Sequence, residues 1–198
     1  MTLIPKEKGT EDPAKTRPIT VSSVLVHLFN KILAKRLEEQ CPVSPRQKAF
    51  RRGDGIAEYI HTLQSAIRHA SQQKTRADPN KKPQSLYVCF LDVKKAFDSV
   101  SHDSLLIACR RLGVPEPLLK YIHGSYERGA TCLQSCGEQS TPISCKQGVK
   151  QGDPLSCFIF NAVIDWVLTS IDPKFSFQYV DHKEGPQVWN LKPKIPDL

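Results

Sequence analysis

The sequence contains no run of 18 apolar residues and no signal-peptide pattern, so it predicts neither a membrane-spanning helix nor export. It also lacks a Cys-X-X-Cys pair, and its seven cysteines are an odd number without the spacing of a disulfide framework. Cys89, Cys109 and Cys157 stand inside apolar runs, where cysteine packs as a small hydrophobic side chain. Because free cysteines persist in a reducing compartment, we expect an intracellular location, in the cytoplasm or the nucleus.

The positive charge is spread unevenly along the chain. Residues 1–83 carry 16 basic and 8 acidic side chains, hence a net charge of +8, whereas residues 84–198 carry 12 of each. Such asymmetry favours a polyanionic partner for the first part of the chain, nucleic acid first and an acidic membrane surface second. Charge alone also fits a basic surface that only keeps the protein soluble.

An apolar run that ends at a carboxylate stands near the middle of the chain. Leu86 to Leu91 predicts a strand buried on both faces, and Asp92 follows it directly. A carboxylate at the end of a buried strand costs free energy unless a partner compensates its charge. Mg²⁺ fits this position because it prefers oxygen ligands and keeps coordination sites for phosphate oxygens. The alternative is that Asp92 caps a turn and Asp98 caps the next helix.

The first residues predict two short strands joined by a polar loop, with Lys6 and Arg17 at or near the ends of that loop. Paired cations on a hairpin can hold a triphosphate, arginine through its planar fork and lysine as a point charge. Ordinary surface charge gives the same pattern. The sequence therefore leaves both interpretations of these cations open.

Two helices and an intervening basic loop are expected next. Ser22 or Ser23 can cap a helix that runs to about Gln40. Its apolar stripe consists of Leu25, Leu28, Phe29, Ile32, Leu33 and Leu37. Residues 44–55 form a basic, glycine-containing loop that is a candidate for contacts with phosphate groups.

The second helix follows this loop. Its apolar stripe consists of Ile56, Tyr59, Ile60, Leu63, Ile67 and Ala70. The polar, proline-containing residues 71–84 predict a mobile loop that joins two lobes.

Two shorter helices and a hairpin are expected after the central run. Asp103 can cap a helix that ends at Leu112, and Pro115 can start another. Residues 130–147 predict a hairpin that turns at Cys136-Gly137.

A final helix is predicted to begin after a glycine-containing loop. Asp153 is a good N-cap, Pro154 is a good first helical residue, and the helix should reach about Ser170. Gln151 and Gly152 therefore stand just before a helix N-terminus, which favours anions. A glycine there would let the backbone approach a flat ligand. The alternative is a cap preceded by a conventional loop.

Three motifs in this order, LIPK…RPIT, FLDVKKAFDSVSHDSL and GVKQGDPLS, resemble the reverse transcriptase domain of non-LTR (LINE-like) retrotransposons, most closely those that insert into ribosomal DNA. The resemblance covers residues 1 to about 172. It implies an α+β right-hand polymerase fold, with fingers over 1–85, a partial palm over 86–182 and no thumb. Residues 183–198 contain three prolines and show no helical period, so they predict an irregular tail. The resemblance also implies RNA-directed DNA synthesis, with Mg²⁺ as cofactor, an RNA template, a DNA primer and dNTPs as partners, and no membrane partner.

The resemblance assigns roles to residues around the central run. Asp92 matches the first catalytic aspartate, a ligand of both Mg²⁺ ions, and the Val93 carbonyl matches a lesser ligand. Phe97 matches the aromatic side chain that lies under the sugar and rejects a 2′-OH. These roles agree with two-metal phosphoryl transfer, which needs carboxylates shared between the ions.

The other two motifs are assigned to the substrate. Lys6 and Arg17 match the fingers cations that contact the triphosphate. Gln151 and Gly152 match the pair that contacts the incoming nucleotide and the template base.

The chain also departs from the family pattern. Cys157 stands where the family usually has proline, and the family's adjacent pair of aspartates occurs nowhere in the sequence. Tyr179-Val180-Asp181-His182 is the nearest equivalent, so Asp181 is a candidate metal ligand while His182 replaces the second carboxylate. We therefore expect an incomplete retroelement reading frame that is weakly active or inactive. The alternative is a remnant that binds nucleic acid without catalysis.

Overall fold

The computed structural model describes residues 1–6, 8, 12, 15–76, 86–135 and 137–171. The chain divides into two compact units. Residues 1–43 and 93–166 form the first unit, and residues 44–92 and those from 167 onward form the second. The mixture of helices and strands in the chain as a whole agrees with the expected α+β class.

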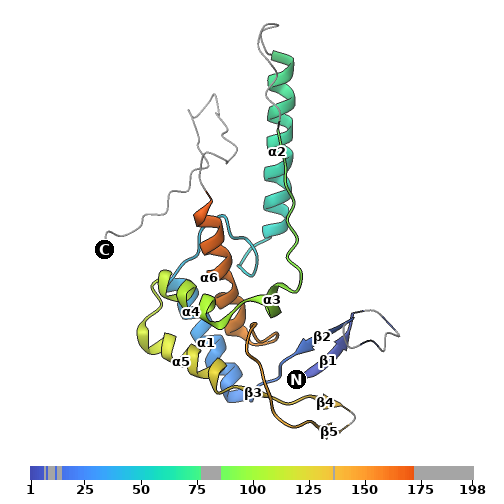
Figure 1. Ribbon diagram of the computed structural model, residues 1–198. Helices are drawn as coiled ribbons and strands as arrows, with labels where there is room; N and C mark the ends of the chain where they lie inside the picture. The colour runs from blue at the N-terminus through green and yellow to red at the C-terminus, as the bar shows by residue number, and fades with distance from the viewer. Residues whose placement is uncertain (7, 9–11, 13–14, 77–85, 136, 172–198) are drawn as a thin grey trace. The chain divides into compact units, whose positions relative to one another are not determined.

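Four helices enclose the core of the first unit (Figure 1). They are α1 (Val24–Gln40), α4 (His102–Arg111), α5 (Glu116–Glu127) and α6 (Pro154–Ser170). The most deeply buried apolar side chains come from α4, α5 and α6 and are Leu105, Ala108, Cys109, Ile122, Ile159 and Ala162. Full burial of a leucine or isoleucine side chain stabilises the fold by about 1.5–3 kcal/mol, so each large member of this cluster contributes substantially to stability.

Short sequence signals set the helix ends. The Ser23 hydroxyl accepts a hydrogen bond from the Val26 N–H at 3.4 Å, as expected for the cap of α1. The cap of α4 is Ser101, whose hydroxyl accepts from the Ser104 N–H at 3.1 Å, so the expectation that Asp103 caps this helix is wrong. A serine oxygen one residue before the helix reaches the free N–H groups that Asp103, already inside the first turn, cannot reach.

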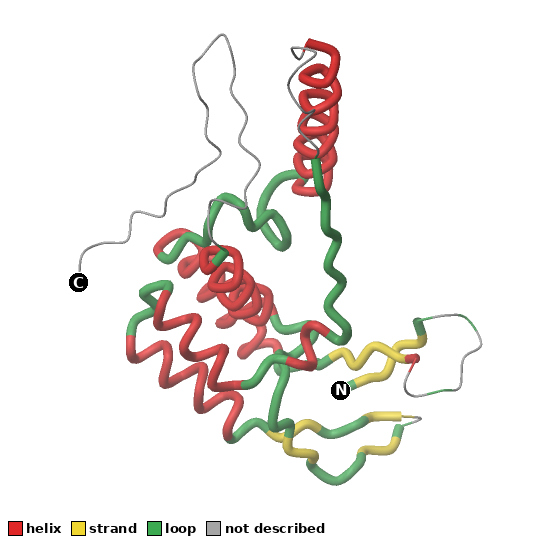
Figure 2. Tube along the Cα trace, turned by 45° about the horizontal axis from the view of Figure 1, so that its top comes forward, coloured by secondary structure: helices red, strands yellow, loops and turns green. Residues whose placement is uncertain are grey.

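The described strands form three two-stranded antiparallel pairs (Figure 2). The pair β1 (Thr2–Pro5) and β2 (Thr16–Ile19) confirms the predicted first hairpin. The predicted second hairpin contains the pairs β3 (Ala130–Thr131) with β6 (Ile143–Ser144) and β4 (Gln134–Ser135) with β5 (Glu138–Gln139). The Gln134 N–H donates to the Met1 carbonyl at 3.0 Å and thereby ties the two hairpins together.

The second unit contains one long helix, α2 (Gly55–Arg76), preceded by the irregular segment 44–54. The predicted loop over 71–84 starts too early, because the helix continues through residue 76. Residues 77–84 lie outside the described residues. Six further helical residues are consistent with the sequence, since glutamine, lysine and arginine are good helix formers.

The strand predicted from Leu86 to Leu91 does not form, since residues 86–93 have no regular secondary structure. Tyr87 is 90% exposed and Phe90 is 82% exposed. A strand buried on both faces needs neighbours that pair with its N–H and C=O groups and cover its side chains. None of the described strands pairs with this segment. The apolar run therefore gives a strand propensity but not a sheet.

The alternative interpretation expected Asp98 to cap the next helix, and this is wrong. It lies inside a one-turn helix, α3 (Ala96–Ser99), whose N-cap is Lys95. Lys95 adopts the left-handed region, with φ 50° and ψ 44°.

The two predicted apolar stripes are only partly buried. On α1 the buried side consists of Asn30, Leu33, Ala34 and Leu37, whereas Leu25 is 79% exposed. On α2, Ile56 is 76% exposed and Ile60 is 53% exposed. Periodicity identifies an apolar face, but another element has to pack on that face to bury it. Among the described residues, no helix is both long and apolar enough to cross a membrane.

Candidate functional site

Residues 147–153 connect the second hairpin to α6 and are held by backbone hydrogen bonds on two sides. On one side they contact the segment around α3. Gln147 forms an isolated β-bridge with Ser101. The Gly148 N–H donates to the Val100 carbonyl at 2.7 Å. The Val149 N–H donates to the Phe97 carbonyl at 2.8 Å, so the loop and α3 share a fixed backbone geometry.

The other side of the loop contacts the residue that follows β2. The Gln151 carbonyl accepts a hydrogen bond from the Thr20 N–H at 2.7 Å. Gly152 has a φ of +98°, and a Cβ atom there would lie 2.8 Å from the Thr20 carbonyl oxygen. The close approach that demands glycine is therefore to this chain's own backbone. Packing within the chain is therefore enough to explain why residue 152 is glycine, without the flat ligand that the sequence suggested.

Lys150 anchors the loop to α5. Its ammonium group donates to the Ser125 carbonyl at 2.9 Å and lies 5.3 Å from the centre of the Tyr126 ring. A cation near the C-terminal carbonyls of a helix and above an aromatic face is stabilised by both. Burial raises the pKa of Tyr126 to about 12, so its hydroxyl is protonated at neutral pH.

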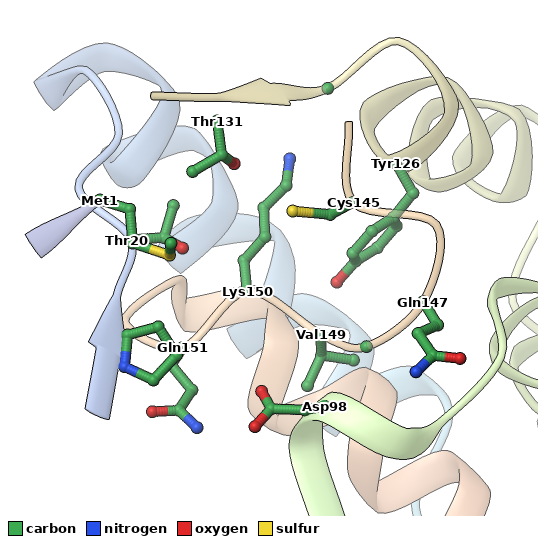
Figure 3. A pocket seen from close by; sticks show the side chains of 13 residues that line it. Met1, Thr20, Asp98, Tyr126, Thr131, Cys145, Gln147, Val149, Lys150 and Gln151 are labelled. Carbon is green, nitrogen blue, oxygen red and sulfur yellow. The ribbon is translucent and has the colours of Figure 1, made fainter. Parts of the chain in front are cut away.

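A pocket of about 190 Å³ opens beside this loop. Figure 3 shows Lys150 running along it between Thr131 and Tyr126, with Gln151 and Asp98 at its other end. The lining therefore offers an ammonium, a carboxylate, an amide and hydroxyl groups. Sequence reasoning singled out Gln151 but missed the contribution of Tyr126 and Lys150. Lys150 lies within the GVKQGDPLS motif, which was the available signal.

Three predicted nucleotide-site positions, Lys6, Arg17 and Gln151, belong to elements that meet in the first unit. Gln151 contacts the residue after β2, and that strand carries Arg17 opposite Ile4. The Lys6 N–H donates to the Lys15 carbonyl at 3.0 Å, which continues the hairpin beyond β1. Both Lys6 and Arg17 are exposed, so their side chains reach solvent.

Phe97, unlike the exposed Lys6 and Arg17, packs against the core of the first unit. Its ring is half-buried and packs on Phe160 of α6, with ring centres 4.6 Å apart. Its carbonyl accepts the hydrogen bond from Val149. Phe97 therefore links the core to the loop, and its expected contact with a sugar stays a prediction.

Two of the three predicted metal ligands lie in the described part of the chain: Asp92 is exposed, and Val93 directly follows it. Asp181 lies outside the described residues, so its role as a metal ligand stays a prediction. Within the described ranges, no group of three or more His, Cys, Asp or Glu side chains could hold a metal ion. Mg²⁺ needs near-octahedral oxygen coordination, and a single exposed carboxylate does not provide it. The described residues alone therefore do not fit a Mg²⁺ site.

The basic loop of the second unit uses several of its cations internally. The Arg51 guanidinium donates to the Ser44 and Gln47 carbonyls at 3.4 and 3.3 Å. Lys48 forms an ion pair with Glu58. These contacts define the shape of the loop, and its expected contact with phosphate groups stays a prediction.

Comparisons with known proteins match this arrangement of motifs to one family. The family model described as "Reverse transcriptase (RNA-dependent DNA polymerase)" matches residues 4–182. The chain is 43% identical over 171 residues to a "Retrovirus-related Pol polyprotein from type-1 retrotransposable element R2" of Popillia japonica. It is 40% identical over 187 residues to the R2 polyprotein of Nasonia vitripennis. It is 39% identical over 196 residues to the R2DM polyprotein of Drosophila melanogaster.

These matches cover 86%, 94% and 99% of this chain, but only 23%, 17% and 17% of the respective relatives. The chain thus spans about a fifth of the length of the curated relatives that it matches. They confirm the resemblance to non-LTR retrotransposons that the three motifs indicated. The chain belongs to the reverse transcriptase (RNA-dependent DNA polymerase) family.

Proposed function

We propose that this chain forms the nucleotide-binding part of an RNA-directed DNA polymerase, with fingers over 1–85 and a partial palm over 86–182. The observation that carries the proposal is the convergence of the three motifs. The GVKQGDPLS loop donates to Phe97 of the central motif and accepts from Thr20, the last residue of RPIT. These backbone hydrogen bonds bring together motifs that lie about 50 and 130 residues apart in the chain, which supports a shared site around this loop.

In this proposal each element has a separate task. The β1–β2 hairpin presents Lys6 and Arg17 to the triphosphate, where an arginine fork can make paired charge-assisted hydrogen bonds. The anchored backbone of Gln151 fixes where its half-buried amide side chain can meet a base. Phe97, fixed by Phe160 and Val149, provides a rigid aromatic surface next to that loop.

We propose further that this chain by itself is weakly active or inactive. A pair of Mg²⁺ ions needs several anionic oxygens, because the ions repel each other and each demands octahedral coordination. The sequence offers Asp92 but no adjacent pair of aspartates. Each tenfold loss of rate corresponds to about 1.4 kcal/mol of barrier, so losing a shared ligand is expected to cost several powers of ten.

Nucleotide binding tests the first proposal. The affinity of a fluorescent dNTP is measured with Mg²⁺ and an RNA template annealed to a DNA primer, for the chain and for Arg17→Gln. Loss of charge-assisted hydrogen bonds predicts about tenfold weaker binding. Arg36→Gln is the matched control, because Arg36 is exposed on α1 and outside the three motifs. Equal affinities for the two variants would contradict the proposal.

Primer extension tests the second proposal. Extension on the same RNA template is compared between the chain and Asp92→Ala, and both are expected to stay near background. Vigorous synthesis by the chain that Asp92→Ala abolishes would show that the sequence contains a complete metal site, with Asp181 as the first candidate for its second ligand.

A non-catalytic nucleic-acid binder is the second candidate. It is favoured by the charge asymmetry, since residues 1–83 carry the whole net charge of +8. Such a protein would bind a duplex with steep salt dependence and little sequence preference. It would show the same affinity for template–primer with Arg17→Gln and Arg36→Gln, and no affinity for the dNTP.

A further inference from the structure

We propose that Tyr121, Asn30 and Asp153 form a positioning chain that holds Gln151 and Gly152 in the shape that receives the nucleotide. The proposal deepens the proposed function and rests on it for the identity of the ligand. None of the three residues is expected to touch substrate. Tyr121 and Asn30 are proposed to fix the side chain of Asp153, and Asp153 in turn to fix the backbone of Gly152, which directly precedes it.

The three side chains are linked by two consecutive hydrogen bonds, each donated towards Asp153. The Tyr121 hydroxyl donates to Asn30 Oδ1 at 2.7 Å, and Asn30 Nδ2 donates to Asp153 Oδ2 at 2.7 Å. The other carboxylate oxygen of Asp153 accepts from the Leu155 N–H at 2.9 Å. Both oxygens of Asp153 are thus engaged, one by the backbone of α6 and one by a side chain of α1.

The surroundings fix the chain of hydrogen bonds. Asn30 is 5% exposed, so water cannot replace its partners freely. The Tyr121 ring packs edge-on against Phe29, with ring centres 5.2 Å apart. Burial raises the pKa of Tyr121, and the nearby charge of Asp153 raises it further, so the hydroxyl keeps the proton that it donates.

Stability alone does not account for these polar side chains. Burying an amide and part of a carboxylate carries a desolvation cost, and apolar side chains of similar size would fill the same space without it. What apolar side chains cannot do is set the orientation of a carboxylate. Asp153 directly follows Gly152, whose close contact with Thr20 tolerates little displacement. The three helices α1, α5 and α6 are thereby tied to one point of the loop.

A charge swap separates positioning from packing. Asn30→Asp places two carboxylates in contact, which disfavours ionisation of both. Combining Asn30→Asp with Asp153→Asn restores one donor and one acceptor with the polarity reversed, and asparagine remains a good helix cap. Tyr121→Phe is a milder variant that removes only the first hydrogen bond. Tyr59→Phe is its matched control, because the Tyr59 hydroxyl donates to the Arg46 carbonyl within the second unit.

The main measurement is amide hydrogen exchange at Thr20, whose N–H donates to Gln151. We expect Asn30→Asp to raise its exchange rate about tenfold or more, as expected for the loss of a hydrogen bond to a charged group. The double variant should restore the rate to within about threefold of the original, and Tyr121→Phe should raise it while Tyr59→Phe does not. Exchange at Ile122, in the core of α5, serves as the internal reference. An unchanged rate at Thr20 in Asn30→Asp, or no restoration in the double variant, would overturn the proposal.

Affinity for the fluorescent dNTP is measured on the same variants with the RNA–DNA template–primer. Under the proposal it falls in Asn30→Asp and recovers in the double variant. Absence of dNTP binding by the original chain would refute the proposed function, while the exchange rates would still decide whether the three residues position the loop. Altered exchange with unaltered dNTP affinity would limit the three residues to a structural role and overturn the positioning proposal.

Discussion

Replacing Gly152 by alanine tests whether close packing against Thr20, rather than a ligand, is what requires glycine in the loop. Gly152 has a φ of +98°, and the new Cβ would lie 2.8 Å from the Thr20 carbonyl oxygen and 3.3 Å from Ile19 Cγ2. Left-handed backbone costs an L-residue about 1–2 kcal/mol, and crowding in a packed site adds about 1–3 kcal/mol. The free energy of unfolding should therefore fall by about 2–5 kcal/mol.

Gly113 provides the matched control for this prediction. Its φ is +84°, yet a Cβ there would meet nothing within 4 Å. Gly113→Ala should therefore show only the backbone cost of about 1–2 kcal/mol. The difference between the two variants isolates the contact with Thr20. The assay is urea unfolding followed by circular dichroism, and equal losses for Gly113→Ala and Gly152→Ala would refute the reasoning.

Three further predictions follow from the fold and the charge distribution. Burial raises the pKa of Tyr126 to about 12, so the protonated hydroxyl contributes its full share of the unfolding free energy below its ordinary pKa of about 10. That share is lost as the pH rises from about 10 towards 12. Urea unfolding at increasing alkaline pH should show this loss of stability, and the loss should be smaller in Tyr126→Phe. Phe97→Ala removes the ring packed on Phe160 and should cost about 2–3 kcal/mol of unfolding free energy, whereas Phe90→Ala, at an 82% exposed position, should stay within about 0.5 kcal/mol. Binding to an RNA–DNA duplex should weaken roughly a thousandfold between 50 and 200 mM salt if about six phosphates are contacted, as measured by fluorescence anisotropy, and a change below about threefold would argue against a phosphate-binding surface.

Local signals predicted most of the helices. Ser23 and the Asp153-Pro154 pair set helix starts, and Gly113, with a φ of +84°, follows the end of α4. These signals work because a cap satisfies N–H groups of its own turn, and a glycine after a helix adopts a conformation that other residues avoid. The positions of these helix ends are therefore set by residues that lie only a few positions away in the sequence.

The pairing of strands and the burial of helix faces could not be predicted from the local sequence pattern. The run from Leu86 to Leu91 has the composition of a buried strand, yet no described strand pairs with it. The apolar side chain of Leu25 shares a stripe with Leu33, yet only Leu33 is buried. Strand pairing and helix burial depend on which other element arrives at a surface, and composition does not state this.

The sequence by itself determined the family, through three ordered motifs, and named Gln151 and Gly152 as the candidate site. Only the tertiary structure showed that Gly152 packs against Thr20 and that Lys150 binds the end of α5. It alone placed Asn30, an unremarked residue of α1, in hydrogen-bond contact with Asp153. Motifs record which side chains a site needs, whereas the contacts that hold them come from residues 91 to 123 positions apart, which only folding brings together.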